Sequence, residues 1–354
     1  MDTQTVLDRA CEHAALGPRG ANPLVGAVLV EHSTGRNATG YHRGRGTAHA
    51  EVDAIRNAQA ANLELAQCTL YVTLEPCAHH GVTPPCTQAI LQVGIRHVVY
   101  AVPDPTPTAS GGAHTLRTAG VDVTHVPHRP SQVLNDRWLV AQHGGRPFIT
   151  AKIAQSLDGY VAAADGTSQW ITGDAARAHA HTLRHTVDAI AVGTGTLLHD
   201  DPTLTARATS DGPQPLRVHI GLTPTPDTAK VRGDGNFLHL MTRNPTEVAH
   251  TLATRGIRHL LIEGGPTLIG AFLQANLVDV LQVYTAPLLL GAGTSSANLP
   301  QVTTLAHGLR LTPDPTTQPQ WLGTDLLTHY IPSAHVQSTS HNTTAAHASG
   351  ESHV

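Results

Sequence analysis

The sequence predicts an α/β protein built from two domains, and three observations lead to that prediction. Its 354 residues exceed the length of one typical domain. Short apolar runs, such as VGAVLV at 25–30, alternate with helical stretches along the chain. The alternation stops at GGRP, residues 144–147, and then begins again. Such a rhythm is typical of a largely parallel sheet with helices on both faces, so we expect two of these sheets.

The first series of elements occupies residues 1–145. Periodic apolar positions predict helices at 6–16, 50–60, 86–94, 111–120 and 131–143. Apolar runs predict strands at 23–30, 69–75, 97–102 and 121–126. The stretch STGRNATG at 33–40 is rich in turn-forming residues and predicts a turn after the first strand.

The second series occupies residues 146–332. Strands are expected at 146–156, 185–193, 215–221, 237–242, 258–264 and 278–291. Helices are expected at 172–186, 244–256 and 265–277. Residues 333–354 lack apolar periodicity, so we expect a disordered tail.

Composition narrows the class of protein. No apolar run is long enough for a transmembrane helix, and the first residues, MDTQTVLDRACEH, lack the apolar region of a secretory signal. A net charge of −4 gives no overall basic surface for nucleic acid. Four cysteines in such a chain indicate a reducing cytoplasm, where clustered cysteines serve metals more often than disulfides. We therefore expect a cytoplasmic protein that binds neither membrane nor nucleic acid.

Three residues of the first series offer the ligands of a catalytic zinc site. Zinc accepts imidazole nitrogen and thiolate sulfur, and His49, Cys77 and Cys86 would supply three ligands, with the fourth position left to water. Glu51 would stand beside them as a proton carrier. Residues two apart point to nearly opposite sides of a helix, so His49 and Glu51 can share a site only where a helix begins. The expected helix at 50–60 begins there.

This set of residues predicts a particular reaction. Zinc lowers the pKa of its bound water to about 7, which makes hydroxide available at neutral pH. Glu51 could take the water's proton and pass it to departing ammonia. A histidine and a glutamate two residues apart, followed by a proline–cysteine pair and a second cysteine, are the known signature of hydrolytic deamination of an aminated heterocycle.

At these motifs the chain resembles the cytidine deaminase superfamily, and more closely one family within it. Eight residues separate the two cysteines in CAHHGVTPPC, and LEPC, TPPC, GYH at 40–42 and the NPLVGAVLV strand accompany them. These features resemble the bifunctional riboflavin-biosynthesis deaminase–reductase family. The resemblance implies a cytidine-deaminase-like α/β/α sandwich at 1–145. It also implies substrate contacts by Asn22, His42 and His80.

The second series matches the reductase domain of the same family, through KIAQSLDGY at 152–160, SQWIT at 168–172 and IEGGPTLIGAFL at 262–273, and also through residues 183–207. The resemblance, which covers residues 1–332, implies a fold like dihydrofolate reductase that binds NADPH, and association into a homo-oligomer through this domain. It places Lys152 at the reacting ribose and implies substrate contacts by Ser168, Arg184, Leu204, Arg207 and Glu263. The implied cofactor contacts are Ala154, Trp170, Thr196, Asp200, Gly265, Pro266, Thr267, Leu268, Ile269, Gly270 and Ala271.

The residues themselves are compatible with that assignment. Glycines precede the expected helix at 265–277, whose free N–H groups could hold cofactor phosphates. Arg184 and Arg207 could bind a substrate phosphate through paired hydrogen bonds. Lys152 is one of only two lysines, in a chain that otherwise uses arginine. Hydride transfer needs no metal but requires donor and acceptor carbons held close together.

Together the two halves imply consecutive steps on one small phosphorylated substrate. The first domain would deaminate 2,5-diamino-6-ribosylamino-4(3H)-pyrimidinone 5′-phosphate. The second would use NADPH to reduce the ribosyl group to ribityl.

The sequence also departs from the family pattern. Val82 stands where the family usually has lysine or arginine, and Thr106 where it has asparagine. Ala21 replaces a proline, and Gly221 replaces an aspartate after the strand at 215–221. Loss of one charged phosphate contact costs about 1.5–3 kcal/mol, so deamination could be weakened or its substrate changed.

Arg43 or Arg45 could compensate for the lost charge. Two alternatives stay open at this stage. The chain could be a paralogue that acts on a related aminopyrimidine or purine nucleotide. Alternatively, the zinc domain could bind nucleotide without turnover, leaving only the reductase active. Retention of Glu51 argues against the second alternative, because a scaffold has no need of a proton carrier.

Overall fold

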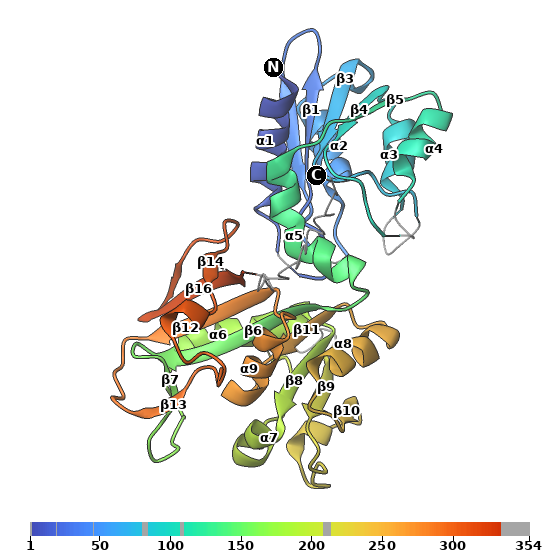
Figure 1. Ribbon diagram of the computed structural model, residues 1–354. Coiled ribbons are helices and arrows are strands. Elements are labelled where there is room, and N and C mark those ends of the chain that lie inside the picture. Colours follow the sequence, from blue (N-terminus) through green and yellow to red (C-terminus); the bar gives the residue numbers. More distant parts are fainter. Residues whose placement is uncertain are drawn as a thin grey trace, which may run out of the picture.

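A computed structural model describes residues 2–18, 20–44, 46–79, 84–106, 110–207 and 214–333. These residues form two large sheets with their own helices and a small two-stranded ribbon, and the long helix α5 (Arg129–His143) lies between the two large sheets (Figure 1). Apart from Ser333, the tail expected at 333–354 lies outside the described residues. Within the described ranges, no helix is both long enough and apolar enough to cross a bilayer.

The first sheet has five strands in the order β2-β1-β3-β4-β5. Their bounds are β1 Gly26–Glu31, β2 Asn37–Tyr41, β3 Cys68–Val72, β4 His97–Tyr100 and β5 Asp122–His125. β3, β4 and β5 are parallel, whereas β1 is antiparallel to both β2 and β3. The expectation of a largely parallel sheet is therefore wrong for this half, which has a mixed sheet.

The error lies in the stretch 33–40, where the sequence predicts only a turn. Gly35 adopts a φ of +70° and donates its N–H to Glu31 O at 2.9 Å, so the chain reverses within a few residues and returns as β2. The residues of β2, NATGY, are mostly small and polar, so this strand has little of the apolar alternation by which strands are predicted. A Cβ at Gly40 would lie 2.2 Å from Ala54 N, so this glycine allows a helix to pack directly on the strand.

Helices cover both faces of this sheet. Apolar residues of α2 (Ala50–Ala60), α3 (Cys86–Gln92) and α4 (Gly112–Thr118) pack with Ala27 and Leu29 on one face. α1 (Thr3–Ala14) packs on the other face with Val28, and Trp138 of α5 joins it there. Neighbouring residues of β1 thus point to opposite faces, as the two-residue period of a strand requires. Apart from the stretch at 33–40, each element predicted in residues 1–145 is present.

The second sheet has nine strands, eight of them in the order β10-β9-β8-β11-β6-β12-β16-β14, with β15 paired to β16. The six strands expected from sequence form its continuous parallel part: β6 Phe148–Ser156, β8 Ala189–Gly193, β9 Leu216–Ile220, β10 Phe237–Leu240, β11 His259–Ile262 and β12 Val280–Ala286. The helices are α6 Asp174–Leu183, α7 Thr194–Asp200, α8 Pro245–Thr254 and α9 Pro266–Gln274.

The elements at the edges of this half were not expected from the sequence. β14 Leu311–Pro313 and β15 Gln320–Leu322 pair with β16 Asp325–Pro332, which is antiparallel to β12. β7 Tyr160–Ala163 and β13 Gly293–Ser295 form a separate ribbon, and α7 was also not expected. Several of these strands are only three residues long and largely exposed, so they carry little apolar pattern to detect.

A buried carboxylate joins the two halves. Asp279 is fully buried before β12, and its side chain forms a two-bond ion pair with Arg146, with N–O distances of 2.7 and 2.8 Å. It also accepts the N–H of Ile149 at 2.8 Å and lies 3.3 Å from Nε of Arg137, which belongs to α5. Arg137 in turn donates to Val278 O at 2.6 Å. These contacts fix the end of α5 on the second sheet.

We expect Asp279→Ala to destabilise the whole chain by about 3–5 kcal/mol, because it leaves two buried guanidinium groups without their counter-charge. Chemical denaturation followed by circular dichroism would measure the loss. Asp227→Ala is the matched control: Asp227 pairs with Arg232 while fully exposed to water, so its removal should leave stability almost unchanged. Equal effects of the two substitutions would contradict the role given to Asp279.

A second buried polar group at the junction makes stability depend on pH. His259 begins β11, is 2 % exposed, and its Nε2 lies 2.9 Å from Thr150 Oγ1. A Cβ built on Gly20, in the first half, would lie 3.0 Å from this ring. Burial lowers the pKa of His259 to about 4, so the folded protein keeps it neutral.

We predict that the folded chain loses stability as the pH falls from about 6.5 to 4. Above pH 6.5, His259 is neutral in both the folded and the unfolded chain. Between pH 6.5 and 4, His259 becomes protonated in the unfolded chain but stays neutral in the folded chain, so acid favours unfolding. The full effect is about 3 kcal/mol. Denaturation curves at several pH values would show a shallower acid slope for His259→Leu than for the exposed control His114→Gln. Parallel slopes would refute the assignment.

Candidate zinc and cofactor sites

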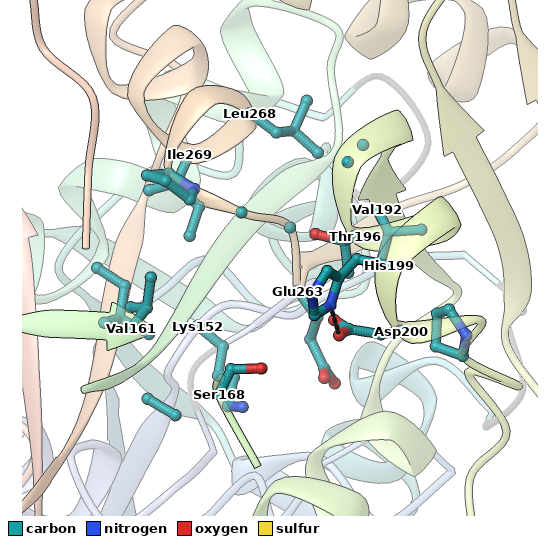
Figure 2. A pocket seen from close by; sticks show the side chains of 18 of the residues that line it. Lys152, Val161, Ser168, Val192, Thr196, His199, Asp200, Glu263, Leu268 and Ile269 are labelled. Carbon is teal, nitrogen blue, oxygen red and sulfur yellow. Dashed lines mark hydrogen bonds and ion pairs between the residues drawn. The ribbon is translucent and has the colours of Figure 1, made fainter. Parts of the chain in front are cut away.

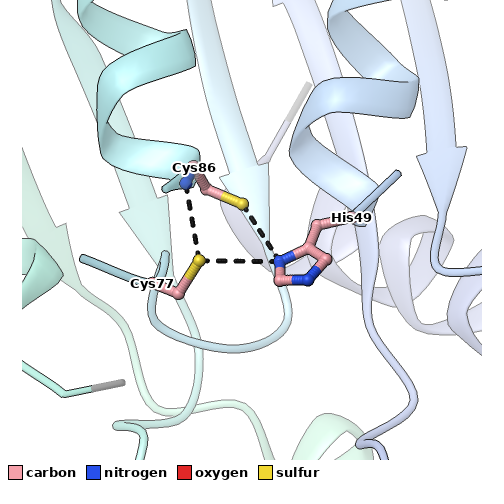
Figure 3. A group of neighbouring side chains, drawn as sticks. All are labelled: His49, Cys77 and Cys86. Atoms are coloured by element: carbon pink, nitrogen blue, oxygen red, sulfur yellow. Dashed lines mark hydrogen bonds between the residues drawn. The ribbon is translucent and has the colours of Figure 1, made fainter. Parts of the chain in front are cut away.

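The structure brings the three expected zinc ligands together. His49 Nδ1 lies 3.5 Å from Cys77 Sγ and 3.3 Å from Cys86 Sγ (Figure 3). One ligand atom from each residue falls within 4.8 Å of the others. His49 is the residue before α2, Cys86 is the first residue of α3, and Cys77 lies in the loop after β3. A histidine nitrogen and two thiols at this spacing fit zinc, with one position free for a further ligand.

The two thiols have different affinities for a proton. The hydrogen bond from Cys86, aided by His49, lowers the pKa of Cys77 to about 4, and the Cys86 N–H also lies 3.4 Å from Cys77 Sγ. The hydrogen bond to Cys77 and burial together raise the pKa of Cys86. The pair therefore retains one proton at neutral pH, which a bound cation would displace.

Glu51 lies in the first turn of α2 and is 3 % exposed. Burial, reinforced by the nearby Cys77, raises its pKa to about 7. A carboxyl group with a pKa near neutrality can both accept and release a proton at physiological pH. At the start of α2, His49 thus faces the two sulfurs, and two residues later the Glu51 carboxyl group is buried.

Asn22 and His42 lie next to this group. Their side chains are 3.2 Å apart, and the His42 ring packs edge-on against the His49 ring with 5.2 Å between centroids. The third expected substrate contact, His80, lies outside the described residues, as do Val82 and Arg45.

Thr106 and Arg43, two of the described positions tied to the family departures, both have partners within the first half. Thr106 is held by its own turn, because its N–H and its hydroxyl both bond to Asp104, at 2.8 and 2.6 Å. The Arg43 side chain also has partners: its guanidinium group packs over the Tyr41 ring and lies 3.3 Å from the Asp53 carboxylate. Any role of Arg43 in binding substrate would compete with these two contacts.

A cavity of about 1260 Å³ opens in the second half. It is lined by the expected substrate contacts Ser168, Arg184, Leu204, Arg207 and Glu263, together with Lys152. The expected cofactor contacts on its wall are Ala154, Trp170, Thr196, Asp200, Gly265, Pro266, Thr267, Leu268, Ile269 and Ala271. Figure 2 shows Lys152, Ser168 and Glu263 around the same space. Gly270 is the exception: a Cβ there would lie 2.0 Å from Asn298 O, so it faces the packing behind α9.

Glu263, Arg184 and Lys152 lie together in this cavity and form what we call its floor. Glu263 follows β11 and holds Arg184 through two hydrogen bonds of 2.8 and 2.9 Å. Burial by itself would raise the pKa of Glu263. The neighbouring Arg184, aided by Lys152, has the larger effect and keeps this pKa below its usual value. Burial lowers the pKa of Lys152, and Glu263 partly offsets that effect. The floor therefore combines the paired Glu263 and Arg184 with Lys152, and Arg207 lines the same cavity.

The sequence analysis did not find His181 or Arg177, which also line the cavity. His181 Nε2 lies 3.1 Å from Arg207, while its buried Nδ1 has no hydrogen-bond partner among the described residues. Arg177 packs over the Trp170 ring at 4.5 Å. Both lie on α6, one helical turn apart. The chain contains 25 histidines, so a histidine here gave no signal by itself.

Family models match both halves of the chain. The model described as the cytidine and deoxycytidylate deaminase zinc-binding region matches residues 1–102, and the model described as the RibD C-terminal domain matches residues 147–318. The riboflavin biosynthesis protein RibD of Corynebacterium ammoniagenes is 43% identical over 84% of this chain and 89% of its own length. That of Mycobacterium tuberculosis (strain H37Rv) is 41% identical over 85% and 90%.

Solved structures are also similar to this chain over most of its length. Acinetobacter baumannii RibD (form 1) has a TM-score of 0.71 at 33% identity, covering 94% of this chain and 99% of its own. A Thermotoga maritima protein gives 0.70 at 29% identity with the same coverage. Its title names a diaminohydroxyphosphoribosylaminopyrimidine deaminase/5-amino-6-(5-phosphoribosylamino)uracil reductase.

The fold and the two sites define a two-domain enzyme that combines a zinc-dependent deaminase with an NADPH-dependent reductase. The chain belongs to the RibD family, the bifunctional deaminase–reductases of riboflavin biosynthesis. The resemblance inferred from its motifs is thereby confirmed, and so are the expected cofactors, zinc and NADPH. The alternatives of a paralogue in another pathway and of a non-catalytic zinc domain are not favoured.

We expect Cys77→Ala to abolish stoichiometric zinc binding, because it leaves one nitrogen and one sulfur at the site. Metal content of the purified chain, measured by mass spectrometry of the metal, would show the loss. Cys11→Ala is the matched control: that thiol lies on α1, outside the group, and its removal should leave one zinc per chain. Equal zinc content in both variants would place the metal elsewhere.

Proposed function

We propose that His49, Cys77 and Cys86 hold the zinc of the deaminase and that Glu51 carries its proton. The observation that supports this most directly is the convergence of the three ligand atoms within 4.8 Å beside a buried carboxyl group. Zinc bound there supplies a water activated for attack. Glu51 would hold the proton that is exchanged at the site and would deliver it to the amino group that leaves the ring as ammonia. Its pKa of about 7 is suited to both transfers.

The proposed substrate is 2,5-diamino-6-ribosylamino-4(3H)-pyrimidinone 5′-phosphate, a small phosphorylated pyrimidine. Asn22 and His42 would contact it beside the zinc ligands, and so would His80, which lies outside the described residues. The support is the family membership and the placement of the two described side chains against His49. Hydrolysis exchanges the ring C–N bond for a C–O bond and consumes one water.

For the reductase we propose that the deaminated product binds at the charged floor of the 1260 Å³ cavity. Ser168 and Arg207 would hold its phosphate, with Leu204 on the wall. Arg184 would contact the substrate as well, with its guanidinium group held in place by two hydrogen bonds to Glu263. Lys152, buried next to this pair, would contact the ribose that is reduced.

NADPH would lie along the wall of the same cavity, against Ala154, Trp170, Thr196 and Asp200. Residues 265–271 would receive its phosphates where α9 begins, since the first N–H groups of a helix have no partner within it. Gly270 contributes there by close packing and does not line the cavity. Bound NADPH supplies the hydride.

We also propose the domain limits 1–145 and 146–332. α5 ends at His143 and β6 begins at Phe148, and the two family models fall on either side of that link. Association into a homo-oligomer through the reductase domain is supported by the exposed side chains of Leu289, after β12, and Trp321, on β15, each 69 % exposed.

A location in the cytoplasm, and no binding of nucleic acid, complete the proposal; both rest on composition, with a net charge of −4 and four free cysteines.

A coupled assay tests the proposed function. The zinc-loaded chain, incubated with NADPH and the proposed substrate, should release ammonia and then oxidise NADPH, and mass spectrometry should find the ribitylamino product. Absence of both signals would refute the substrate assignment. Ammonia release without NADPH oxidation would refute only the reductase half.

We predict that Glu51→Gln lowers deamination by about 10²–10⁴-fold, because the amide cannot carry the proton. Zinc content and NADPH oxidation with already deaminated substrate should persist, since Glu51 belongs to the first half only. Glu12→Gln, an exposed position on α1, is the matched control and should leave both activities unchanged. Loss of both activities in Glu51→Gln would show that the two sites are not separate.

A further inference from the structure

Residues of the reductase half contact the loop that carries Asn22. Nη2 of Arg258, just before β11, lies 3.1 Å from Ala21 O and 3.1 Å from Asn22 Oδ1. The neighbouring His259 packs against Gly20 of the same loop. A segment next to the zinc ligands therefore rests on the start of a strand in the other sheet.

The contact with Arg258 fixes which way the Asn22 amide points. A guanidinium group can only donate hydrogen bonds, so the Asn22 oxygen must face Arg258. The amide nitrogen is then directed at His42 Nε2, 3.2 Å away. Without a donor at position 258, the oxygen and nitrogen of this amide could exchange places.

The orientation of Asn22 is matched by the position of the proton on the His42 ring. Since Asn22 donates to Nε2, that nitrogen must accept, and the proton of the neutral ring lies on Nδ1. Nδ1 then donates to Ala48 O at 3.2 Å. Ala48 directly precedes His49, whose ring the His42 ring contacts. The series of contacts runs from Arg258 to the residue that binds the metal.

We propose that Arg258 is a positioning residue for the deaminase, supplied by the reductase half. It acts through Asn22 and His42 and does not touch the substrate itself. The inference rests on the proposed role of these two residues in binding the deaminase substrate. It means that the first domain depends on the second for the orientation of its binding groups, in addition to being linked to it in one chain.

The loop backbone has other supports, so the role of Arg258 can be tested without unfolding it. Trp138 Nε1 also donates to Ala21 O, at 3.2 Å. The backbone N–H and C=O of Leu24 both bond to the Asn135 side chain, at 2.8 Å each. Substitution of Arg258 should therefore free the Asn22 side-chain amide from its hydrogen bond, while the backbone of the loop keeps its conformation.

The test measures steady-state deamination by the full-length, zinc-loaded chain with the proposed substrate. Arg258→Met keeps the length of the side chain but removes its donors, and should raise KM about tenfold while kcat stays within about threefold. Arg258 is exposed, so we expect a moderate effect. Arg258→Lys, which also only donates, should restore KM to within about threefold of the native value. Arg255→Ala, exposed at the end of α8, is the matched control and should leave KM unchanged.

A double-mutant cycle separates positioning from simple docking of the halves. Asn22→Ala should raise KM, and adding Arg258→Met to it should change KM by less than about twofold, because Arg258 acts through Asn22. Additive effects would overturn the proposal, and so would an unchanged KM in Arg258→Met or a failure of Arg258→Lys to rescue it. Loss of zinc or of NADPH oxidation in Arg258→Met would show a purely structural contact. A native chain that releases no ammonia would instead refute the proposed function.

Discussion

The buried ion pairs of Asp279 hold the two halves of this enzyme in one arrangement. The carboxylate accepts hydrogen bonds from Arg146 and from the Ile149 N–H, and Arg137 of α5 lies against it. An ion in the interior requires its partners, and these partners come from the helix and the link between the sheets. Such pairs specify geometry more than they add net stability. With α5 fixed in this way, the loop at residues 20–22 lies on the start of β11.

The two sites use different parts of the α/β architecture. At the zinc site, His49 and Cys86 stand where α2 and α3 begin, and the loop after β3 brings Cys77 to them. In the second half, Gly193, Gly221 and Glu263 stand at the carboxyl ends of the parallel strands β8, β9 and β11, around the cavity. Crevices at these strand ends are the usual binding places of parallel sheets. One site concentrates ligands for a cation, and the other provides room for a long cofactor and an anionic substrate.

The electrostatics of the sites follow from burial and pairing. Glu51 is buried near a thiol of low pKa, so it holds its proton until near neutrality. Glu263 is half-buried, and its pKa lies below the usual value because Arg184 donates a hydrogen bond to each of its oxygens. Two glutamates of one chain thus have opposite shifts in pKa. The first suits proton transfer, and the second suits a fixed negative charge that orients its cationic neighbours.

The sequence by itself determined the elements with strong patterns and the chemistry of the zinc site. Six parallel strands and the helix at 50–60 follow from apolar periodicity. His49, Cys77 and Cys86 follow from the types of ligand that zinc requires, and Glu51 follows from the need for a proton carrier beside them. Only the tertiary structure decided the antiparallel return of β2, the edge strands β14 and β15, and the contact of Arg258 with Asn22. Periodicity records which face of an element is buried. It carries no information on which exposed residues, more than 200 positions apart in the chain, come to lie within hydrogen-bond distance.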